Sequence, residues 1–176
     1  MTYFEDLSRY TFDATASGTA WARNVGWLDA NHDFPKGHPR AALLDAIWDY
    51  CSILVVPTRG IHGCELCVSP SPTFVRHDTR LLLGSGEIRI FDSTGGIFAA
   101  PNLVYHYILD HQYRPPEEFL DAVENGPRPG GEEYKALLSG LRAPWQENTP
   151  IREEPRQVRF ARTENGVELE EVKRRS

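Results

Sequence analysis

The sequence has few cysteines, no long apolar run and no surplus of positive charge, and each shortage excludes a class of protein. Its three cysteines are an odd number for a framework of paired disulfides. No apolar run approaches the roughly 20 residues that span a bilayer, so we expect no association with a membrane. Lys and Arg number 19 against 25 Asp and Glu, a formal net charge of −6. This acidic balance makes nucleic acid an unlikely partner, because phosphate backbones are repelled.

The first residues, MTYFEDLSRY, contain neither a basic segment nor an apolar stretch of the kind found in secretory signals. We therefore expect a cytoplasmic location. A reducing cytosol disfavours structural disulfides, so Cys64 and Cys67 call for another explanation. Cys51 lies in an apolar stretch and is expected to be a small buried side chain.

The composition, 40% hydrophobic and 25% charged, is that of a globular protein, and 176 residues suit one domain with an extension. We expect a zinc-binding α+β domain at residues 1–126, and a linker with a short helix at residues 127–145. Residues 146–176 are expected to form a charged tail or a hairpin turning at Asn165-Gly166, ordered alone or on a partner.

Apolar spacing and end signals predict four helices. Residues 40–51 carry Leu43, Leu44, Ile47 and Trp48 on one stripe, which is typical of an amphipathic helix. Three further helices are expected at residues 101–113, 114–126 and 132–145. The third of the four begins with Pro116 and two glutamates and ends at Asn125-Gly126, which favour a helix start and stop.

Short β-branched runs separated by turn residues predict strands. They lie at residues 52–57, 79–84, 87–92 and 97–101. The last three predict a small antiparallel β-meander with helices packed against it. With the cysteine segment before the strands and a helix after them, the expected fold is α+β with a treble-clef-like order of zinc knuckle, strands and helix.

The segment RGIHGCELC, residues 59–67, contains a Cys-x-x-Cys pair at Cys64 and Cys67. A thioredoxin-type redox pair requires a following helix, and Val-Ser-Pro-Ser-Pro-Thr cannot start one there. Two unrelated reduced thiols are the second interpretation. A metal knuckle is favoured, because this spacing lets both sulfurs reach one ion and Gly63 permits a tight turn.

A tetrahedral zinc ion needs two further ligands, and three histidines compete for the two places. His106 and His111 form an H-x4-H pair of the kind that follows a Cys-x-x-Cys in zinc sites. They lie about 140° apart on an ideal helix, so both can bind only if the helix ends or loosens at His111. Pro115 and Pro116 favour that end. His62 shares a face with Cys64 in an extended arm and competes evenly with His111.

The sequence lacks the H-E-x-x-H pattern and the zinc-deaminase pattern. Glu65, inside the knuckle, and Asp110, one turn after His106, are weak candidates for a catalytic base. Two thiolates with one or two imidazoles are more typical of a closed structural site than of an open catalytic one.

Five segments together resemble an uncharacterised bacterial domain family. They are MTYFEDLS, NVGWLD, RGIHGCELC, GSGEIRIF and AAPNLVYHYILDHQYRPPEEF, which fall within residues 1–125. The resemblance implies a single small cytosolic domain that shares the Cys/His segment, and it implies no activity.

Three functions are compatible with the sequence. The first is a zinc-stabilised accessory or protein-interaction domain with a protein partner bound by the tail. The second is a small zinc-dependent hydrolase or lyase, in which His62 or water completes the metal shell. The third is a nucleic-acid-binding zinc module, in which Arg76, Arg80 and Arg89 form a local basic face.

Overall fold

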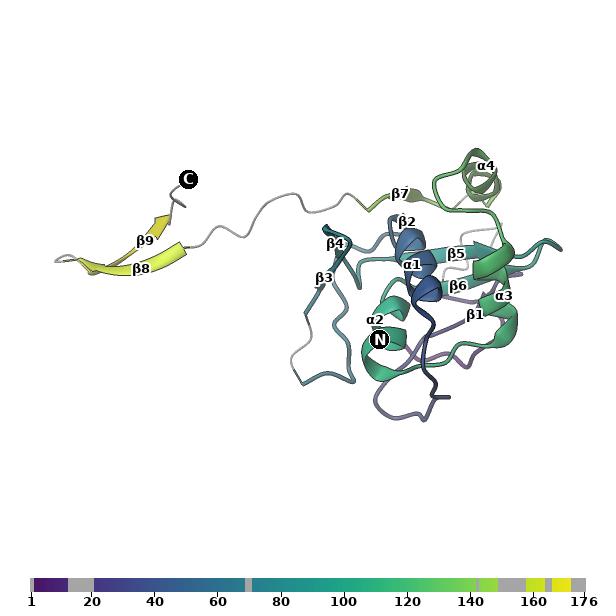
Figure 1. The fold of residues 1–176 in the computed structure, drawn as a ribbon, viewed down its shortest axis with the longest axis horizontal. Coiled ribbons are helices and arrows are strands. Elements are labelled where there is room, and N and C mark those ends of the chain that lie inside the picture. Colours follow the sequence, from purple (N-terminus) through teal and green to yellow (C-terminus); the bar gives the residue numbers. More distant parts are fainter. Residues whose placement is uncertain are drawn as a thin grey trace.

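The structure is a computed structural model that describes residues 2–12, 21–68, 71–141 and 143–148, and the backbone of residues 158–163 and 166–171. Within these residues the chain forms four helices, one mixed sheet of five strands and two hairpins of two strands (Figure 1). The predicted α+β class is confirmed.

The central sheet has the strand order β1-β6-β5-β2-β7. Its strands are β1 (Arg23–Asn24), β2 (Ile53–Val55), β5 (Glu87–Phe91), β6 (Ile97–Pro101) and β7 (Trp145–Glu147). β1 runs parallel to β6, and the other neighbours are antiparallel. The strands predicted at residues 52–57, 87–92 and 97–101 are confirmed as members of this sheet.

The predicted meander is wrong in its first strand. Strand β4 (Thr79–Leu82) pairs with β3 (Thr73–Arg76) in a separate hairpin and not with β5. His77 and Asp78 form the turn with φ angles of 46° and 59°. Such left-handed angles are most common for glycine, and this turn contains none, so the usual sequence signal of a hairpin is missing.

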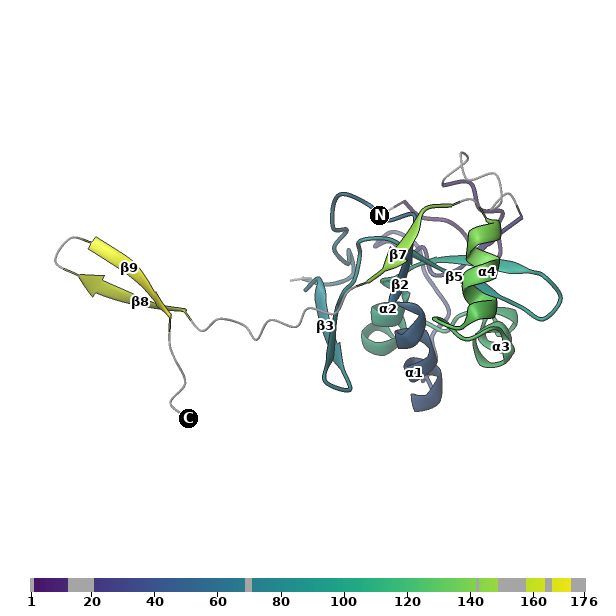
Figure 2. The same cartoon turned by 90° about the horizontal axis from the view of Figure 1, so that it is seen from above.

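The helices are α1 (Ala41–Tyr50), α2 (Val104–His111), α3 (Glu117–Asn125) and α4 (Glu132–Gly140). The predicted apolar stripe of α1 is confirmed, since Leu43, Leu44, Ile47 and Trp48 are all buried. Helices α1, α2 and α3 lie on one side of the sheet and the N-terminal segment on the other (Figure 2). This layer fixes α2 beside the cysteine segment.

The opposite face of the sheet carries polar side chains that are nevertheless buried. Glu87 and Arg89 of β5 alternate with Ile88 and Ile90, which face the helices. The N-terminal segment covers Glu87 and Arg89, and Tyr10 donates a hydrogen bond to Glu87 Oε1 at 2.9 Å. Arg89 is 0% exposed, so the expectation that it belongs to a basic surface is wrong.

Residues beyond 126 also contact the sheet. Tyr134 of α4 is buried and donates a hydrogen bond to the carbonyl of Arg89 at 2.7 Å, and β7 pairs with β2. Strand β7 is a difference from the sequence prediction, which places Trp145 at the end of a helix and the following residues in the tail. The domain division at residue 126 stays a prediction.

Strands β8 (Val158–Thr163) and β9 (Gly166–Glu171) pair antiparallel with each other, as the expected tail hairpin requires. In the part of the chain that the structure describes, none of the helices has the length and apolar character needed to cross a membrane.

Candidate metal centre

The arm that leads into the cysteine segment is fixed by backbone contacts with the β4–β5 connection. The backbone N–H of His62 donates to the carbonyl of Gly84 at 2.8 Å, and the N–H of Gly84 donates to Asn102 Oδ1 at 2.6 Å. Gly84 has a φ of 84°, and a Cβ there would lie 2.1 Å from the carbonyl oxygen of His62. Only glycine allows this close approach, which places the cysteine loop beside the start of α2.

Helix α2 supplies both histidines, His106 as its third residue and His111 at its C-terminal end. Gln112 then adopts a left-handed conformation with a φ of 58°, and the N–H of Tyr113 donates to the carbonyl of Tyr107 at 3.0 Å. The helix therefore ends at His111, two residues before the end of the expected range 101–113, and the imidazole of His111 can turn towards that of His106.

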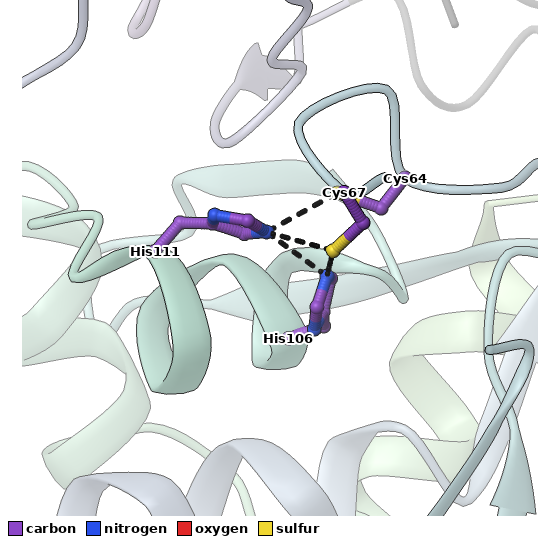
Figure 3. Close-up of side chains that lie close together, drawn as sticks. All are labelled: Cys64, Cys67, His106 and His111. Atoms are coloured by element: carbon purple, nitrogen blue, oxygen red, sulfur yellow. Dashed lines mark hydrogen bonds between the residues drawn. The ribbon is translucent and has the colours of Figure 1, made fainter. Parts of the chain in front are cut away.

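Four side chains converge where the cysteine loop meets α2 (Figure 3). One ligand atom from each of Cys64, Cys67, His106 and His111 lies within 4.8 Å of the other three. The Cys67 Sγ atom is 3.3 Å from the Nε2 atoms of both His106 and His111. His111 Nε2 lies 3.3 Å from Cys64 Sγ and 3.2 Å from His106 Nε2.

These separations resemble the edges of a zinc tetrahedron. Zinc bonds of about 2.3 Å to sulfur and about 2.05 Å to nitrogen give ligand–ligand edges of about 3.3 to 3.8 Å. Four of the six ligand–ligand distances, 3.2 to 3.3 Å, are close to the short end of this range, and all six are within 4.8 Å. Two sulfurs and two nitrogens also match a common ligand set of structural zinc. The residues present therefore fit a transition-metal ion of this kind.

Protonation preferences support the same interpretation. Burial, with a smaller contribution from the neighbouring Cys67, raises the pKa of the Cys64 thiol to about 11. Burial also lowers the pKa of His111, with a further contribution from His106. Without a cation, these two groups are therefore uncharged at neutral pH. A divalent cation stabilises the thiolate and binds the lone pair of a neutral imidazole, so it compensates for the burial of these polar groups.

The cluster has a buried side and a more open side. Cys64 and His106 are each 4% exposed, whereas Cys67 and His111 are partly exposed. Beside His111 lies a wide cavity of about 390 Å³. Its lining residues are Phe34, Lys36, Leu66, Asp110, His111 and Gln112. This cavity offers solvent, and therefore an ion, a route to the open side.

Contacts around His106 hold its ring in place. Its Nδ1 atom lies 2.6 Å from Asp110 Oδ2, and the ring of Phe74 packs against the imidazole with centroids 4.9 Å apart. The sequence did not indicate the contact with Phe74, because strand β3 carries no recognisable hairpin signal.

The structure does not bring His62 or Glu65 into the cluster. Both are exposed, and His62 lines a smaller cavity together with Thr58 and Trp27. The hydrogen bond from the His62 backbone to Gly84 keeps the His62 side chain away from the cluster. The spacing of two residues between His62 and Cys64 did not predict this.

Comparisons with known proteins identify a family for this chain. No curated protein and no solved structure matches the chain. The match is to a family described as a domain of unknown function, DUF7919, and it covers residues 2–124, more than two thirds of the chain. The range agrees with the resemblance found in the sequence, and it includes all four residues of the cluster. The chain belongs to the DUF7919 family of domains of unknown function.

Proposed function

We propose that the chain is a zinc-stabilised accessory or protein-interaction domain, with Cys64, Cys67, His106 and His111 as the zinc ligands. The convergence of these four ligand atoms within 4.8 Å is the observation that carries the proposal. Four protein ligands complete a tetrahedral shell, which is the arrangement of structural zinc sites. The chain order of cysteine loop, β3–β4 hairpin and α2 supports a treble-clef-like zinc unit within the α+β fold.

The ligand types support zinc over other metals. Calcium and magnesium prefer oxygen ligands, and the cluster offers none. Thiolate and imidazole ligands in a tetrahedral set suit zinc, and reduced thiolates are stable in the cytoplasm, where we place the protein.

Exposed apolar side chains near the cluster support a protein partner. Ile61 and Val68 flank the cysteine loop and are 52% and 104% exposed, and Val75 of β3 is 61% exposed. A protein partner that covers these side chains would remove apolar surface from water. The zinc ion would then hold in place the loop that presents Ile61 and Val68.

We expect the purified tag-free protein to carry about one equivalent of zinc, bound by two sulfurs and two nitrogens. Elemental analysis measures the metal content, and X-ray absorption spectroscopy counts the ligands. Cys64→Ser and Cys67→Ser should lose most of the metal. Cys51→Ala is the matched control, because Cys51 is a buried thiol outside the cluster. A wild-type protein without bound transition metal would refute the proposal.

A comparison of buried His106 with exposed His77 gives a second test. His106→Ala should reduce zinc retention after dialysis about tenfold or more, because it removes one of four ligands. His77→Ala should retain zinc like the wild type, since His77 bonds Asp45 at the β3–β4 turn and lies outside the cluster. Equal zinc retention in the two variants would remove His106 from the metal shell.

The cavity beside His111 favours one alternative, a small zinc-dependent hydrolase or lyase. In that alternative His111 leaves the ion or is replaced by water, so that a substrate in the cavity reaches the metal. Asp110 lines the same cavity and would act as the base, whereas Glu65 does not line it. The ligand count separates the two functions, because three protein ligands plus one oxygen indicate an open catalytic site.

The nucleic-acid alternative loses its main support. Arg89 is fully buried, and Arg76 donates hydrogen bonds to Asp45 and to the carbonyl of Ala41. The chain as a whole is acidic, with a formal net charge of −6.

A further inference from the structure

Asp110 lies one helical turn after His106 on α2, and its carboxylate is directed at the imidazole. The distance of 2.6 Å between His106 Nδ1 and Asp110 Oδ2 is that of a strong hydrogen bond. His106 is the proposed ligand on the buried side of the cluster, with a side chain 5% exposed. When Nδ1 carries the proton and donates to the carboxylate, Nε2 has its lone pair free for a metal.

The position of Asp110 in α2 indicates that its bond to His106 is not explained by helix stability. Asp110 lies in the last turn of α2, which ends at His111. The C-terminal end of a helix carries partial negative charge, so a carboxylate there is unfavourable for the helix itself. Its side chain is also 48% exposed, so packing contributes little at this position.

We propose that Asp110 is a positioning residue that sets the metal affinity of the cluster through His106. This inference rests on the proposed zinc site and assigns a role to a residue outside its four ligands. The carboxylate fixes the tautomer of His106, limits rotation of its ring together with Phe74, and increases the basicity of Nε2. In this role the Asp110 carboxylate accepts the hydrogen bond of His106 and does not act as a base on a substrate.

Two substitutions at Asp110 test this role. Asp110→Ala removes the hydrogen-bond acceptor and should weaken zinc binding 10- to 100-fold. Asp110→Asn keeps a neutral acceptor oxygen for Nδ1–H, so it should lose less affinity than the alanine variant. Competition of the full-length protein with a zinc chelator of known affinity measures each dissociation constant.

Asp45→Ala is the matched control. Asp45 Oδ1 lies 2.6 Å from His77 Nε2, so this variant breaks a carboxylate–histidine contact of the same length outside the cluster. Its zinc affinity should equal that of the wild type. The melting temperatures of the metal-free Asp110 variants should be unchanged or slightly higher than that of the metal-free wild type, because a carboxylate leaves the helix C-terminus.

The outcomes are distinct. The positioning role is supported if zinc affinity falls from the wild type to Asp110→Asn and falls further in Asp110→Ala, while Asp45→Ala binds zinc like the wild type. Zinc binding by Asp110→Ala as tight as that of the wild type overturns this role and leaves the zinc site standing. Equal loss in the asparagine and alanine variants overturns the hydrogen-bond mechanism. A wild-type protein that binds no zinc overturns the proposed function itself.

Discussion

Removal of zinc should lower the melting temperature of the protein by roughly 10 °C, and added zinc should restore it. The ion would join the cysteine loop to α2, whose ligand residues are separated from the cysteines by 39 to 47 positions in the chain. Binding to the folded state alone stabilises it by RT ln(1 + [L]/Kd), about 4 kcal/mol at a free zinc concentration a thousandfold above Kd. For a chain of this size, each kcal/mol shifts the midpoint by roughly 2–4 °C. A chelator titration followed by thermal melts measures the effect.

Two controls for this melt compare a variant inside the cluster with one outside it. The Cys64→Ser/Cys67→Ser variant should melt at one temperature with or without chelator, whereas His77→Ala should respond like the wild type. The difference between zinc-loaded and metal-free protein should shrink at acidic pH, where protonation of thiolates and imidazoles releases the ion. An unchanged melt after elemental analysis has shown loss of the metal would contradict the structural role. It would favour the zinc-enzyme alternative.

The helices were predictable because their signals are local. The stripe of Leu43, Leu44, Ile47 and Trp48 predicts one buried face, and all four side chains are buried. Helix α3 begins directly after Pro116, and Gly126 is its C-cap, close to the ends expected from the sequence. These signals act within one or two turns, so they do not depend on the rest of the fold.

The strand pairing was only partly predictable, because it depends on contacts between distant segments. The β5–β6 pair follows from two adjacent β-branched and aromatic runs. The parallel pairing of β1 with β6 joins Arg23 to Phe98 across 75 positions and leaves no sequence pattern. Strand β7 reaches β2 from the far end of the described domain for the same reason.

The cluster depends both on local sequence signals and on contacts between distant segments. The sequence predicted Cys64, Cys67 and His106 and left His62 and His111 as even candidates for the fourth place; the structure brings His111 to the other three. The choice between His62 and His111 depended on how the arm before Cys64 contacts Gly84, which is a long-range backbone contact. Their roles as metal ligands remain predictions until zinc is measured.

The covered face of β5 was the least predictable feature. The alternation in Glu87-Ile88-Arg89-Ile90 is typical of a strand with one face in water, yet the N-terminal segment buries both charged side chains. Arg89 Nη1 donates to Glu87 Oε2 at 2.6 Å, and the guanidinium lies 4.8 Å from the ring centroid of Tyr10. Burial, with a further contribution from the charge of Glu87, raises the pKa of Tyr10. Tyr10 therefore stays protonated and able to donate to the carboxylate.

This buried pair predicts the second large effect. Glu87→Gln should destabilise the protein by about 3–5 kcal/mol, because it leaves the charge of Arg89 buried without its counter-ion. A guanidinium cannot escape this cost by losing its proton. Denaturant unfolding of the wild type and the variant measures the difference. Glu117→Gln is the matched control, since Glu117 pairs with Arg114 on the surface and its loss should cost at most about 1 kcal/mol.

A double variant separates the charge effect from simple loss of packing. Among the described residues, Nε and Nη2 of Arg89 have no hydrogen-bond partner, so the pair itself is incompletely satisfied. Replacing both charges, in Glu87→Gln/Arg89→Met, removes the unpaired cation together with its unsatisfied nitrogens. The double variant should therefore be more stable than Glu87→Gln alone, as found where apolar residues replace buried ion pairs. A double variant less stable than the single one would show that Arg89 stabilises this face through contacts other than its pairing with Glu87.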